Sequence, residues 1–351
     1  MGKRIVIMAG GTGGHVFPAL AVAQSLQEKG WQVSWLGTKK GLESRVVPEN
    51  GIDIDWLSVA GFRGKGLGSK FRAVFGLIRA CFQAALILRR RKPDVALGMG
   101  GFVSGPGGLM AKLLGVPLII HEQNRVPGTT NRYLAKIADQ VLEAFPDSFN
   151  RKVNAVCTGN PLRKKFLTAP KHEAEQTHQR IRILVFGGSQ GAKALNEVVP
   201  EAMALLAEVD VRHQTGAAMR EQVAGRYKAL GIDAEVTAFI DDMAIAYQWA
   251  DLVICRSGAM TVSEVAAMGI PAIFIPLPGA IDDHQVANAR FLADVGAGMI
   301  LLQKDLNAKS LAEKINQARK QLTSMAQSAT RCARLDATES VVGYCVTEAG
   351  L

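Results

Sequence analysis

Two stretches of this sequence, about half a chain apart, are built on the same plan. Residues 5–14 are IVIMAGGTGG, and residues 183–191 are ILVFGGSQG. Each begins as an apolar run, passes through a glycine-rich turn that holds one Thr or Ser, and continues into a segment of helical length. A buried strand that turns through glycines into a helix is the opening unit of a doubly wound α/β domain. Its recurrence favours two such domains over one long sheet.

Short apolar runs separated by segments of helical length recur along the whole chain. Such runs are typical of buried parallel strands in α/β units. We therefore predict two Rossmann-like, doubly wound parallel-sheet domains, residues 1–160 and 161–351, with residues 163–180 as a polar linker. The segment from residue 322 onward has a helical pattern, and its last helix could pack back on the N-terminal domain. The predicted strands are 4–8, 32–36, 54–59, 95–97, 116–120, 181–186, 236–239, 252–255 and 272–275.

The excess of positive charge is confined to the first half of the chain. The net charge is +10, and residues 1–160 hold 21 Lys or Arg against 10 Asp or Glu, a net charge of +11. The remaining residues hold 20 basic and 21 acidic side chains, a net charge of −1. No Asp or Glu lies between Asp55 and Asp94. This asymmetry indicates an anionic partner, either nucleic acid or anionic lipid.

The acid-free segment 70–92 is predicted to be one long helix. Its apolar residues spread over more than one face, so one face can pack on a sheet while the rest, ringed by Arg and Lys, suits an anionic membrane interface. A wholly buried helix with a solvated arginine end is the alternative. A nucleic-acid surface is less favoured, because the segment has no Tyr or Trp to stack on bases. The residues expected at the membrane are Phe75, Ile78, Phe82, Arg89, Arg90 and Arg91.

No hydrophobic segment is long enough to suggest a signal peptide or a spanning helix. The first apolar run, residues 5–9, ends in glycines, and no run approaches the roughly 18 apolar residues that a membrane span needs. The five cysteines are far apart and form no Cys-x-x-Cys pair. We therefore expect reduced thiols in a cytoplasm and no structural zinc. Asp53 and Asp55 fall within an apparent strand, so they are better explained as polar side chains of an edge strand than as a metal site.

The first glycine turn indicates a nucleotide or diphosphate ligand, because backbone N–H groups at a helix N-terminus attract anions. A tight, closely packed turn is the alternative for either loop taken alone. The glycine motif of dehydrogenases does not fit this loop, since Gly-x-Gly-x-x-Gly starting at Gly11 would require glycine at position 16, which is Val16. No Gly-Lys-[Ser/Thr] of a P-loop is present either. We expect no NAD, no ATP, no metal and no other cofactor.

Two further loops follow predicted strands. The glycine cluster 98–108 is either a flexible loop or a second diphosphate cradle, formed by Gly100, Gly101, Ser104 and Gly105. In the loop 256–264, Glu264 could accept hydrogen bonds from a ribose diol, with Arg256 near phosphates. Alternatively, Thr261 and Glu264 have the spacing of a capping box, which would only stabilise the N-terminus of a helix.

Two histidines are candidates for a general base. His15 and His121 each lie just beyond the end of a predicted strand, where ligands bind in open α/β sheets. Imidazole titrates near neutral pH, which suits proton abstraction. A lone histidine is more often structural, so this prediction rests on the position of both residues just beyond a predicted strand. His15 is the first choice because its loop should border the site, and His121 is the second.

Taken together, these motifs resemble those of the MurG family of peptidoglycan glucosaminyltransferases, over nearly the whole chain. The matching elements are GGTGGHVFP at 10–18, the cluster 98–108, HEQN at 121–124, GNPLR at 159–163, GGSQGA at 187–192, FIDDM at 239–243 and the segment 255–264. The resemblance implies the GT-B architecture, two Rossmann-like domains with a cleft between them, and a donor held mostly by the C-terminal domain. The family often has paired glutamines where this chain has His284 and Gln285, so the first position departs from the pattern.

The resemblance also implies a set of donor-binding residues. It places the backbone of Ile240 at the uracil, Glu264 at the ribose, and Ser189 and Arg163 at the diphosphate. The other residues implied at the donor are Thr12, Gly13, Gly14, Asn124, Ala259, Met260, Thr261, Val262, Ser263 and Gln285.

The implied reaction is an inverting transfer of GlcNAc from UDP-GlcNAc to the C4 hydroxyl of MurNAc in lipid I, which gives lipid II. The implied partners are UDP-GlcNAc, lipid I and an anionic membrane surface, with no nucleic acid, at the cytoplasmic face of the bacterial inner membrane. Two alternatives stay open: a UDP-GlcNAc 2-epimerase on the same scaffold, which would need no membrane face, and a non-catalytic nucleotide-sugar or lipid-binding adaptor.

Overall fold

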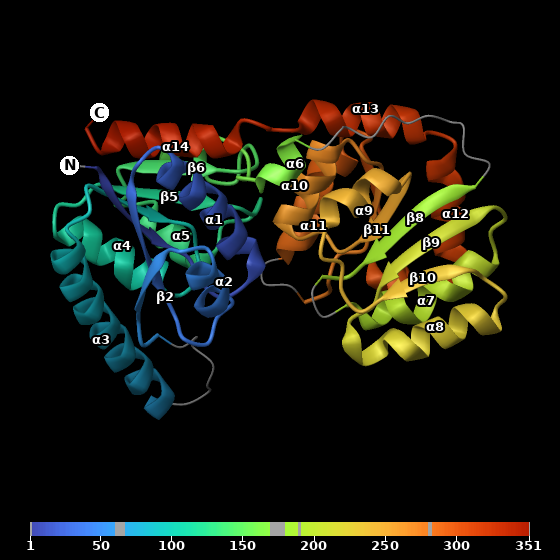
Figure 1. Ribbon diagram of the computed structural model, residues 1–351, viewed down its shortest axis with the longest axis horizontal. Coiled ribbons are helices and arrows are strands. Elements are labelled where there is room, and N and C mark those ends of the chain that lie inside the picture. The colour runs from blue at the N-terminus through green and yellow to red at the C-terminus, as the bar shows by residue number, and fades with distance from the viewer. Residues whose placement is uncertain (1, 60–66, 169–179, 189–190, 280–282, 351) are drawn as a thin grey trace. The chain divides into compact units, whose positions relative to one another are not determined.

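The computed structural model describes residues 2–59, 67–168, 180–188, 191–279 and 283–350. The chain forms two compact units. Unit 1 comprises Met1–Arg163 together with Arg334–Leu351, and unit 2 comprises Lys164–Ala333. Each unit is built on one parallel sheet (Figure 1).

The sheet of unit 1 has seven strands in the order β3-β2-β1-β4-β5-β6-β7, and every neighbouring pair is parallel. Because β1 lies at the centre with β2 on one side and β4 on the other, the strand order reverses there, which is the doubly wound Rossmann topology. The strands are β1 (Arg4–Met8), β2 (Gln32–Gly37), β3 (Asp53–Trp56), β4 (Val95–Gly98), β5 (Leu118–Glu122), β6 (Gln140–Glu143) and β7 (Val156–Cys157).

Side chains of β1 alternate between two buried cores, one on each face of this sheet. Ile5 and Ile7 belong to the core under α1, whereas Val6 and Met8 belong to the core under α3 and α4. Burial on both faces explains why β1 is an unbroken apolar run. The helices of unit 1 are α1 (Gly13–Glu28), α2 (Glu43–Glu49), α3 (Leu67–Arg91), α4 (Ser104–Leu113), α5 (Thr129–Leu134) and α14 (Ala337–Glu348), with a 3₁₀ turn η1 (Arg151–Val153).

The C-terminal helix α14 packs on α1 rather than on unit 2 (Figure 1). Val341, Val342 and Cys345 are buried in the same core as β1 and α1. The hydroxyl of Ser25 on α1 donates to Glu339 at 2.7 Å. The last helix therefore completes a layer of the N-terminal unit.

The sheet of unit 2 has six strands in the order β10-β9-β8-β11-β12-β13, again all parallel. Its central reversal falls between β8 and β11. The strands are β8 (Ile181–Phe186), β9 (Val209–Gln214), β10 (Ala234–Thr237), β11 (Leu252–Cys255), β12 (Ala272–Phe274) and β13 (Gly298–Ile300). The helices are α6 (Lys164–Thr168), α7 (Lys193–Ala204), α8 (Arg220–Ala229), α9 (Met243–Trp249), α10 (Ala259–Met268), α11 (His284–Ala293), α12 (Ala308–Arg319) and α13 (Leu322–Cys332), with 3₁₀ turns η2 (Ala217–Met219) and η4 (Gln303–Asp305).

The predicted α/β class with two doubly wound parallel sheets is confirmed, with differences in detail. The expected strand 116–120 is shifted, since β5 begins at Leu118 and ends at Glu122. The strands β6, β7, β9 and β13 were not predicted. Strand β9 carries Asp210, Arg212 and His213, so its sequence lacks the apolar run of a buried strand. Among the described helices, none is both long enough and apolar enough to cross a bilayer.

Candidate active site

The two glycine clusters of unit 1 follow β1 and β4, the strands that flank the reversal in strand order. Ligands of open α/β sheets bind beyond the carboxyl ends of strands at this point. Gly101 has a φ of +82°, and a Cβ on it would lie 2.4 Å from the carbonyl oxygen of Gly10. The backbones of the two loops therefore touch, and only glycine permits that approach.

The imidazole of His15 lies against the second of these loops. His15 is the third residue of α1, and a Cβ on Gly100 would be 2.8 Å from its Nδ1. The predicted first base and the predicted diphosphate loop are thus neighbours. Ser104 is fully buried, and its hydroxyl bridges Met8 and Gly100. Its side chain therefore holds the loop in shape. Gly105, in the first turn of α4, is the residue of this cluster best placed to offer a backbone N–H.

Glu43 holds the first glycine loop in place through hydrogen bonds. This fully buried carboxylate accepts from the Gly11 N–H at 2.9 Å and from both the N–H and the hydroxyl of Thr38. The Gly11 amide is therefore used within the protein. Amides later in the loop, at Thr12, Gly13 and Gly14, lie at the N-terminus of α1, where the helix dipole favours an anion.

The second predicted base, His121, is a strand residue with no solvent exposure. It lies within β5, paired with Leu142, and not beyond the strand end. Its Nε2 is 2.9 Å from the Gly159 carbonyl oxygen, and its Nδ1 is 3.0 Å from Gln123 Nε2. Burial lowers its pKa to about 4. With both ring nitrogens engaged inside the unit, His121 is poorly placed to abstract a substrate proton directly.

Glu122 organises the loop that carries Asn124. Its buried carboxylate accepts from the backbone N–H of Asn124 at 2.9 Å and of Gly128 at 3.0 Å, and from the side chain of Asn131 at 2.9 Å. Asn124 is thereby held beyond the end of β5. The guanidinium of Arg163 lies over the ring of Phe17 on α1, 5.3 Å from its centroid. Arg163 therefore belongs to unit 1 and lies beside the first turns of α1.

In unit 2 the glycine turn after β8 is held by close backbone contacts. A Cβ on Gly191, which has a φ of +74°, would lie 1.9 Å from the Thr215 carbonyl oxygen. Gly191 lies two residues before α7, which begins at Lys193, and anion binding at this helix N-terminus stays a prediction. Ser189, the residue predicted to contact the diphosphate, lies outside the described residues.

Arg256 makes several hydrogen bonds within unit 2. Its guanidinium donates to the carbonyl oxygens of Ile275 at 2.9 Å and Pro276 at 3.2 Å, and to the side chain of Gln303 at 2.7 Å. Half-buried in this way, it ties the end of β11 to the end of β12. Its Nη1 and Nη2 both donate to protein acceptors, so it helps to position the loop, and its contact with phosphate stays a prediction.

The capping-box explanation for Glu264 is wrong. Helix α10 begins at Ala259 with Gly258 as its N-cap, so Thr261 and Glu264 lie inside the helix. Glu264 accepts from the hydroxyl of Tyr247 at 3.3 Å. Glu264 is half-buried in the second turn of α10, and its contact with the ribose stays a prediction. The neighbouring candidates Ala259, Met260, Val262 and Ser263 occupy the first turns of the same helix.

Hydrogen bonds from two other loops orient Gln285. Its Oε1 accepts from the Leu277 N–H at 2.9 Å, and its backbone carbonyl accepts from the buried Ser257 hydroxyl at 2.8 Å. The amide is therefore fixed with Nε2 as its donor end.

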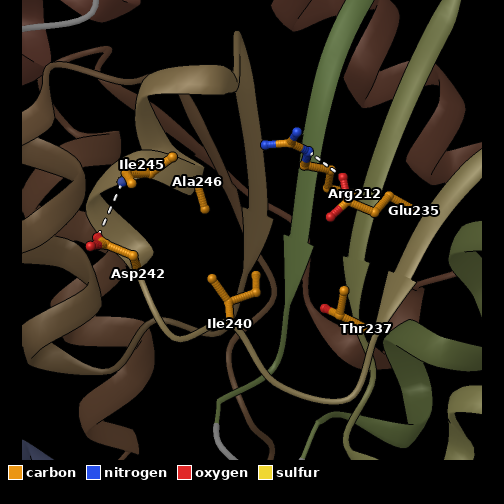
Figure 2. Close-up of a pocket in the computed structure, with 7 residues that line it drawn as sticks. All are labelled: Arg212, Glu235, Thr237, Ile240, Asp242, Ile245 and Ala246. Carbon is orange, nitrogen blue, oxygen red and sulfur yellow. Dashed lines mark hydrogen bonds and ion pairs between the residues drawn. The ribbon is translucent and has the colours of Figure 1, made fainter.

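A cavity of about 180 Å³ adjoins Ile240 (Figure 2). Figure 2 shows Arg212 and Glu235 paired on neighbouring strands and Asp242 bonded to the first turn of α9. The segment at which the resemblance places the uracil thus starts a capped helix. Among the described residues, no cluster of three or more His, Cys, Asp or Glu side chains could hold a metal.

The outer face of α3 is apolar and exposed, which contradicts the alternative of a wholly buried helix. Ala80, Ala84 and Leu88 face the core, whereas on the opposite face Phe75, Ile78 and Phe82 are 71%, 62% and 66% exposed. Val74 and Leu86 extend this exposed stripe. Within the same unit α4 packs beside α3, and its Leu109 and Leu113 are also exposed. We call the exposed residues Val74, Phe75, Ile78, Phe82, Leu86, Leu109 and Leu113 the apolar face.

The arginine cluster at the end of α3 is partly neutralised. Arg90 pairs with Asp55, and Arg91 pairs with both Asp55 at 2.7 Å and Asp53 at 2.9 Å. The hydrogen bond with Asp55 raises the pKa of Arg91. These pairs explain the two aspartates of β3. Arg89, which is exposed like Arg90, takes part in none of these pairs.

Sequence reasoning did not single out Glu43, Glu122 or Gln123, which hold the site of unit 1 together. Glu122 and Gln123 stand within the HEQN motif, so their position beside His121 was the available signal. Nothing in the sequence around Glu43 distinguishes it from a solvated helix residue.

Comparison with known proteins covers the chain from end to end. Residues 5–143 match the glycosyltransferase family 28 N-terminal domain, and residues 182–341 match the family 28 C-terminal domain. The chain is 57% identical to the UDP-N-acetylglucosamine–N-acetylmuramyl-(pentapeptide) pyrophosphoryl-undecaprenol N-acetylglucosamine transferase of Methylococcus capsulatus, with 100% of both chains covered. It is 49% identical to the transferase of that name from Tolumonas auensis, covering 98% of this chain and 99% of the relative.

The structural comparison agrees. The crystal structure of MurG from Acinetobacter baumannii has a TM-score of 0.85 and 42% identity, covering 98% of this chain and 99% of that chain. A UDP-GlcNAc 2-epimerase from Neisseria meningitidis has a TM-score of 0.67 at 12% identity, covering 98% of this chain and 100% of that chain, a likeness of fold alone. The full-length identity and the two matching domain models show that this chain belongs to the MurG transferases of glycosyltransferase family 28.

Proposed function

We propose that this protein transfers N-acetylglucosamine from UDP-GlcNAc to the C4 hydroxyl of MurNAc in the undecaprenyl-diphosphate-linked acceptor, lipid I, to give lipid II. The observation that carries the proposal is 57% identity, over the full length of both chains, to a transferase named for this donor and acceptor. The site geometry is consistent with that reaction, because unit 1 presents an imidazole beside a glycine loop at the reversal of its strand order.

His15 acts as the general base in this proposal. The acceptor hydroxyl loses its proton to the imidazole while its oxygen attacks the anomeric carbon, and a base of this kind contributes about 10²–10⁴-fold to the rate. Direct attack with departure of UDP inverts the anomeric centre. The developing charge on UDP is stabilised by helix N-termini and arginine, with no metal required.

The donor is assigned mainly to unit 2. Glu264 accepts from the ribose diol, the backbone of Ile240 meets the uracil, and Gln285 offers its Nε2 donor to the sugar. Ser189 and the N-terminus of α7 hold the diphosphate, and Ala259–Ser263 line the same end of α10. Thr12, Gly13, Gly14, Asn124 and Arg163 are the contributions of unit 1 to the donor.

The acceptor diphosphate is assigned to the N-terminus of α4. The loop Gly100–Gly101 leads into this helix, Ser104 fixes the loop, and the Gly105 N–H is one of the first-turn donors that no intrahelical acceptor serves. Because His15 touches Gly100, an acceptor bound here brings its sugar close to the base.

The apolar face of α3 and α4 is proposed to insert into the cytoplasmic leaflet of the bacterial inner membrane, where lipid I is anchored. Its exposed aromatic and aliphatic side chains are flanked by cations, including Arg79 and Arg89. Apolar insertion and attraction to anionic lipid act together in such peripheral contacts. We therefore propose a peripheral location at that surface, with no nucleic-acid partner.

The decisive experiment incubates the protein with radiolabelled UDP-GlcNAc and lipid I and measures label in the lipid extract. Transfer into a product with the mobility of lipid II supports the proposal. Conversion of UDP-GlcNAc to UDP-ManNAc without acceptor would indicate an epimerase. Donor binding without any turnover would indicate an adaptor, and either result would overturn the proposed function.

A further inference from the structure

Four groups of unit 1 form a continuous hydrogen-bonded chain behind His15. His15 Nδ1 is 2.7 Å from Gln123 Oε1, and Gln123 Nε2 is 3.0 Å from His121 Nδ1. His121 Nε2 is in turn 2.9 Å from the Gly159 carbonyl oxygen. Gln123 and His121 are 1% and 0% exposed, so water does not compete for these contacts.

Two backbone carbonyls decide where the protons of this chain lie. A carbonyl oxygen can only accept, so the Gly159 carbonyl requires a proton on His121 Nε2, which leaves His121 Nδ1 as an acceptor. The carbonyl of His121 accepts from Gln123 Nε2 at 3.0 Å. The nitrogen of the Gln123 amide must therefore face His121, because a flipped amide would set its oxygen against that carbonyl.

The remaining steps follow from the Gln123 amide. With its nitrogen toward His121, its oxygen faces His15 Nδ1, and that nitrogen must carry a proton. His15 Nε2 is then the nitrogen with the free lone pair. Backbone groups cannot change their protonation, so this proton assignment holds as long as these four groups stay hydrogen-bonded to one another. Burial also lowers the pKa of His121 to about 4, which keeps that ring neutral in physiological conditions.

We propose that Gln123, anchored by His121 and the carbonyls of His121 and Gly159, is a positioning residue that fixes His15 in the tautomer with Nε2 as the base. This inference rests on the proposed function in so far as His15 is the base. The tautomer of the ring that activates a nucleophile governs catalysis, and in Ser-His-Asp enzymes the wrong tautomer costs about 10⁴-fold in kcat.

The first test needs no substrate, and it uses variants only to assign signals. The ¹⁵N shifts of the imidazoles, assigned with His15→Asn and His121→Asn, report which ring nitrogen carries the proton. We expect His15 protonated at Nδ1 and His121 protonated at Nε2 near pH 7.5. A wild-type His15 protonated at Nε2 would overturn the proposal, whether or not the protein transfers GlcNAc.

The second test separates positioning from mere packing. Gln123→Met keeps the size of the side chain but removes its amide, so we expect a mixture of His15 tautomers. The kcat should fall by about 10–10³-fold, less than the whole contribution of a general base, and the KM for UDP-GlcNAc should change less than about threefold. Gln123→Glu can keep an oxygen facing His15 Nδ1 and should retain more turnover than Gln123→Met. A packing role predicts no such rescue, because a buried carboxyl disturbs the core at least as much as Met.

His213→Phe, which removes a buried histidine of unit 2 that bonds Tyr227, is the control for general destabilisation. Its folded fraction should keep the wild-type kcat. If Gln123→Met keeps kcat within about twofold and a single His15 tautomer, the positioning role is wrong. If the wild type itself fails to transfer GlcNAc while its tautomers are as expected, the proposed function fails and the proton assignment stands.

Discussion

The two units share one strand order over six strands, but the loops beside their central strands differ. In unit 1 the loop after β4 is rich in glycine and touches the loop after β1, and His15 lies against it. In unit 2 the equivalent loop follows β11, and its Arg256 donates hydrogen bonds to Ile275 after β12 and to Gln303 in η4. The same topology therefore presents an open backbone surface with an imidazole in one unit and a helix end carrying a carboxylate in the other.

This difference shows that the chemistry of each unit is set by a few buried polar residues at strand ends. Unit 1 commits Glu43, Glu122 and Gln123 to fixing loops, and each is at most 1% exposed. Unit 2 places Glu264 in the second turn of α10, where it is only half-buried. Proton transfer is thus expected to depend on unit 1 and donor affinity on unit 2, and substitutions can separate the two.

The largest effect should come from unit 1. His15→Ala should lower kcat by about 10²–10⁴-fold while the KM for UDP-GlcNAc changes little, because the base acts in the transition state. Steady-state kinetics at saturating lipid acceptor measure both quantities. His213→Phe serves as the control in the other unit, and an alanine variant that keeps most of the wild-type turnover would place the base elsewhere.

Acidification should destabilise both units, since each buries a neutral histidine. Burial lowers the pKa of His121 from 6.5 to about 4 and that of His213 to about 3. Between pH 6.5 and 4 the unfolded chain binds protons that the folded chain refuses, so stability falls as pH falls. For His121 alone the loss reaches about 3 kcal/mol near pH 4, at about 1.4 kcal/mol for each pKa unit.

Urea unfolding at several pH values checks this expectation. His213→Phe should flatten the pH dependence of unit 2 and leave that of unit 1 in place. A wild-type protein whose unfolding free energy is constant from pH 6.5 to pH 4 would show that neither histidine is held neutral in the folded state.

A smaller effect is expected at the donor site of unit 2. Glu264→Gln replaces a charged acceptor of the ribose diol with a neutral one and should weaken UDP-GlcNAc binding by about 1–2 kcal/mol, or roughly 5–30-fold. Calorimetric titration measures the affinity, and a melting curve of the same sample serves as the control for folding. Equal affinities in variant and wild type would remove Glu264 from the donor site.

The smallest effect concerns the surface of unit 1. Arg89→Gln should weaken binding to anionic vesicles by about 1 kcal/mol, and high salt should remove that difference. Flotation with anionic and zwitterionic vesicles provides the measurement. Arg91→Gln is an informative companion, since its loss also breaks the pairs with Asp53 and Asp55. Phe82→Ser should reduce the salt-resistant part of binding, and unchanged flotation of both Arg89→Gln and Phe82→Ser would exclude this face as the membrane contact.

Much of the fold could be predicted because its cause is local. The apolar run before Gly10 and the glycines after it determine a buried strand and a tight turn, and the repeat near Gly187 gives the second sheet. Strand β9 escaped prediction because Arg212 and His213 find partners only in the folded sheet, in Glu235 and Tyr227. Long-range pairing of this kind leaves no local pattern.

The site could be predicted only in outline for the same reason. Position beyond a strand directed attention to His15, whose contact with Gly100 depends on a loop more than 80 residues away. We placed His121 beyond a strand predicted to end at residue 120. In the structure β5 continues through His121, which the sheet buries. The contacts of Arg256 with Ile275 and Pro276 could not be predicted, because backbone oxygens carry no signature in sequence.

The return of α14 to unit 1 has a consequence for how the chain is made. Synthesis delivers residues 1–163 first, yet the core under α1 includes Val341, Val342 and Cys345, which are made only after unit 2. Until then, one face of the first sheet lacks part of its cover, and unit 2 is complete before unit 1. Exposed apolar surface on a nascent chain invites aggregation and chaperone binding. Helix α14 thus completes the N-terminal unit, and a chain that stopped before Ala337 would leave the core under α1 partly uncovered.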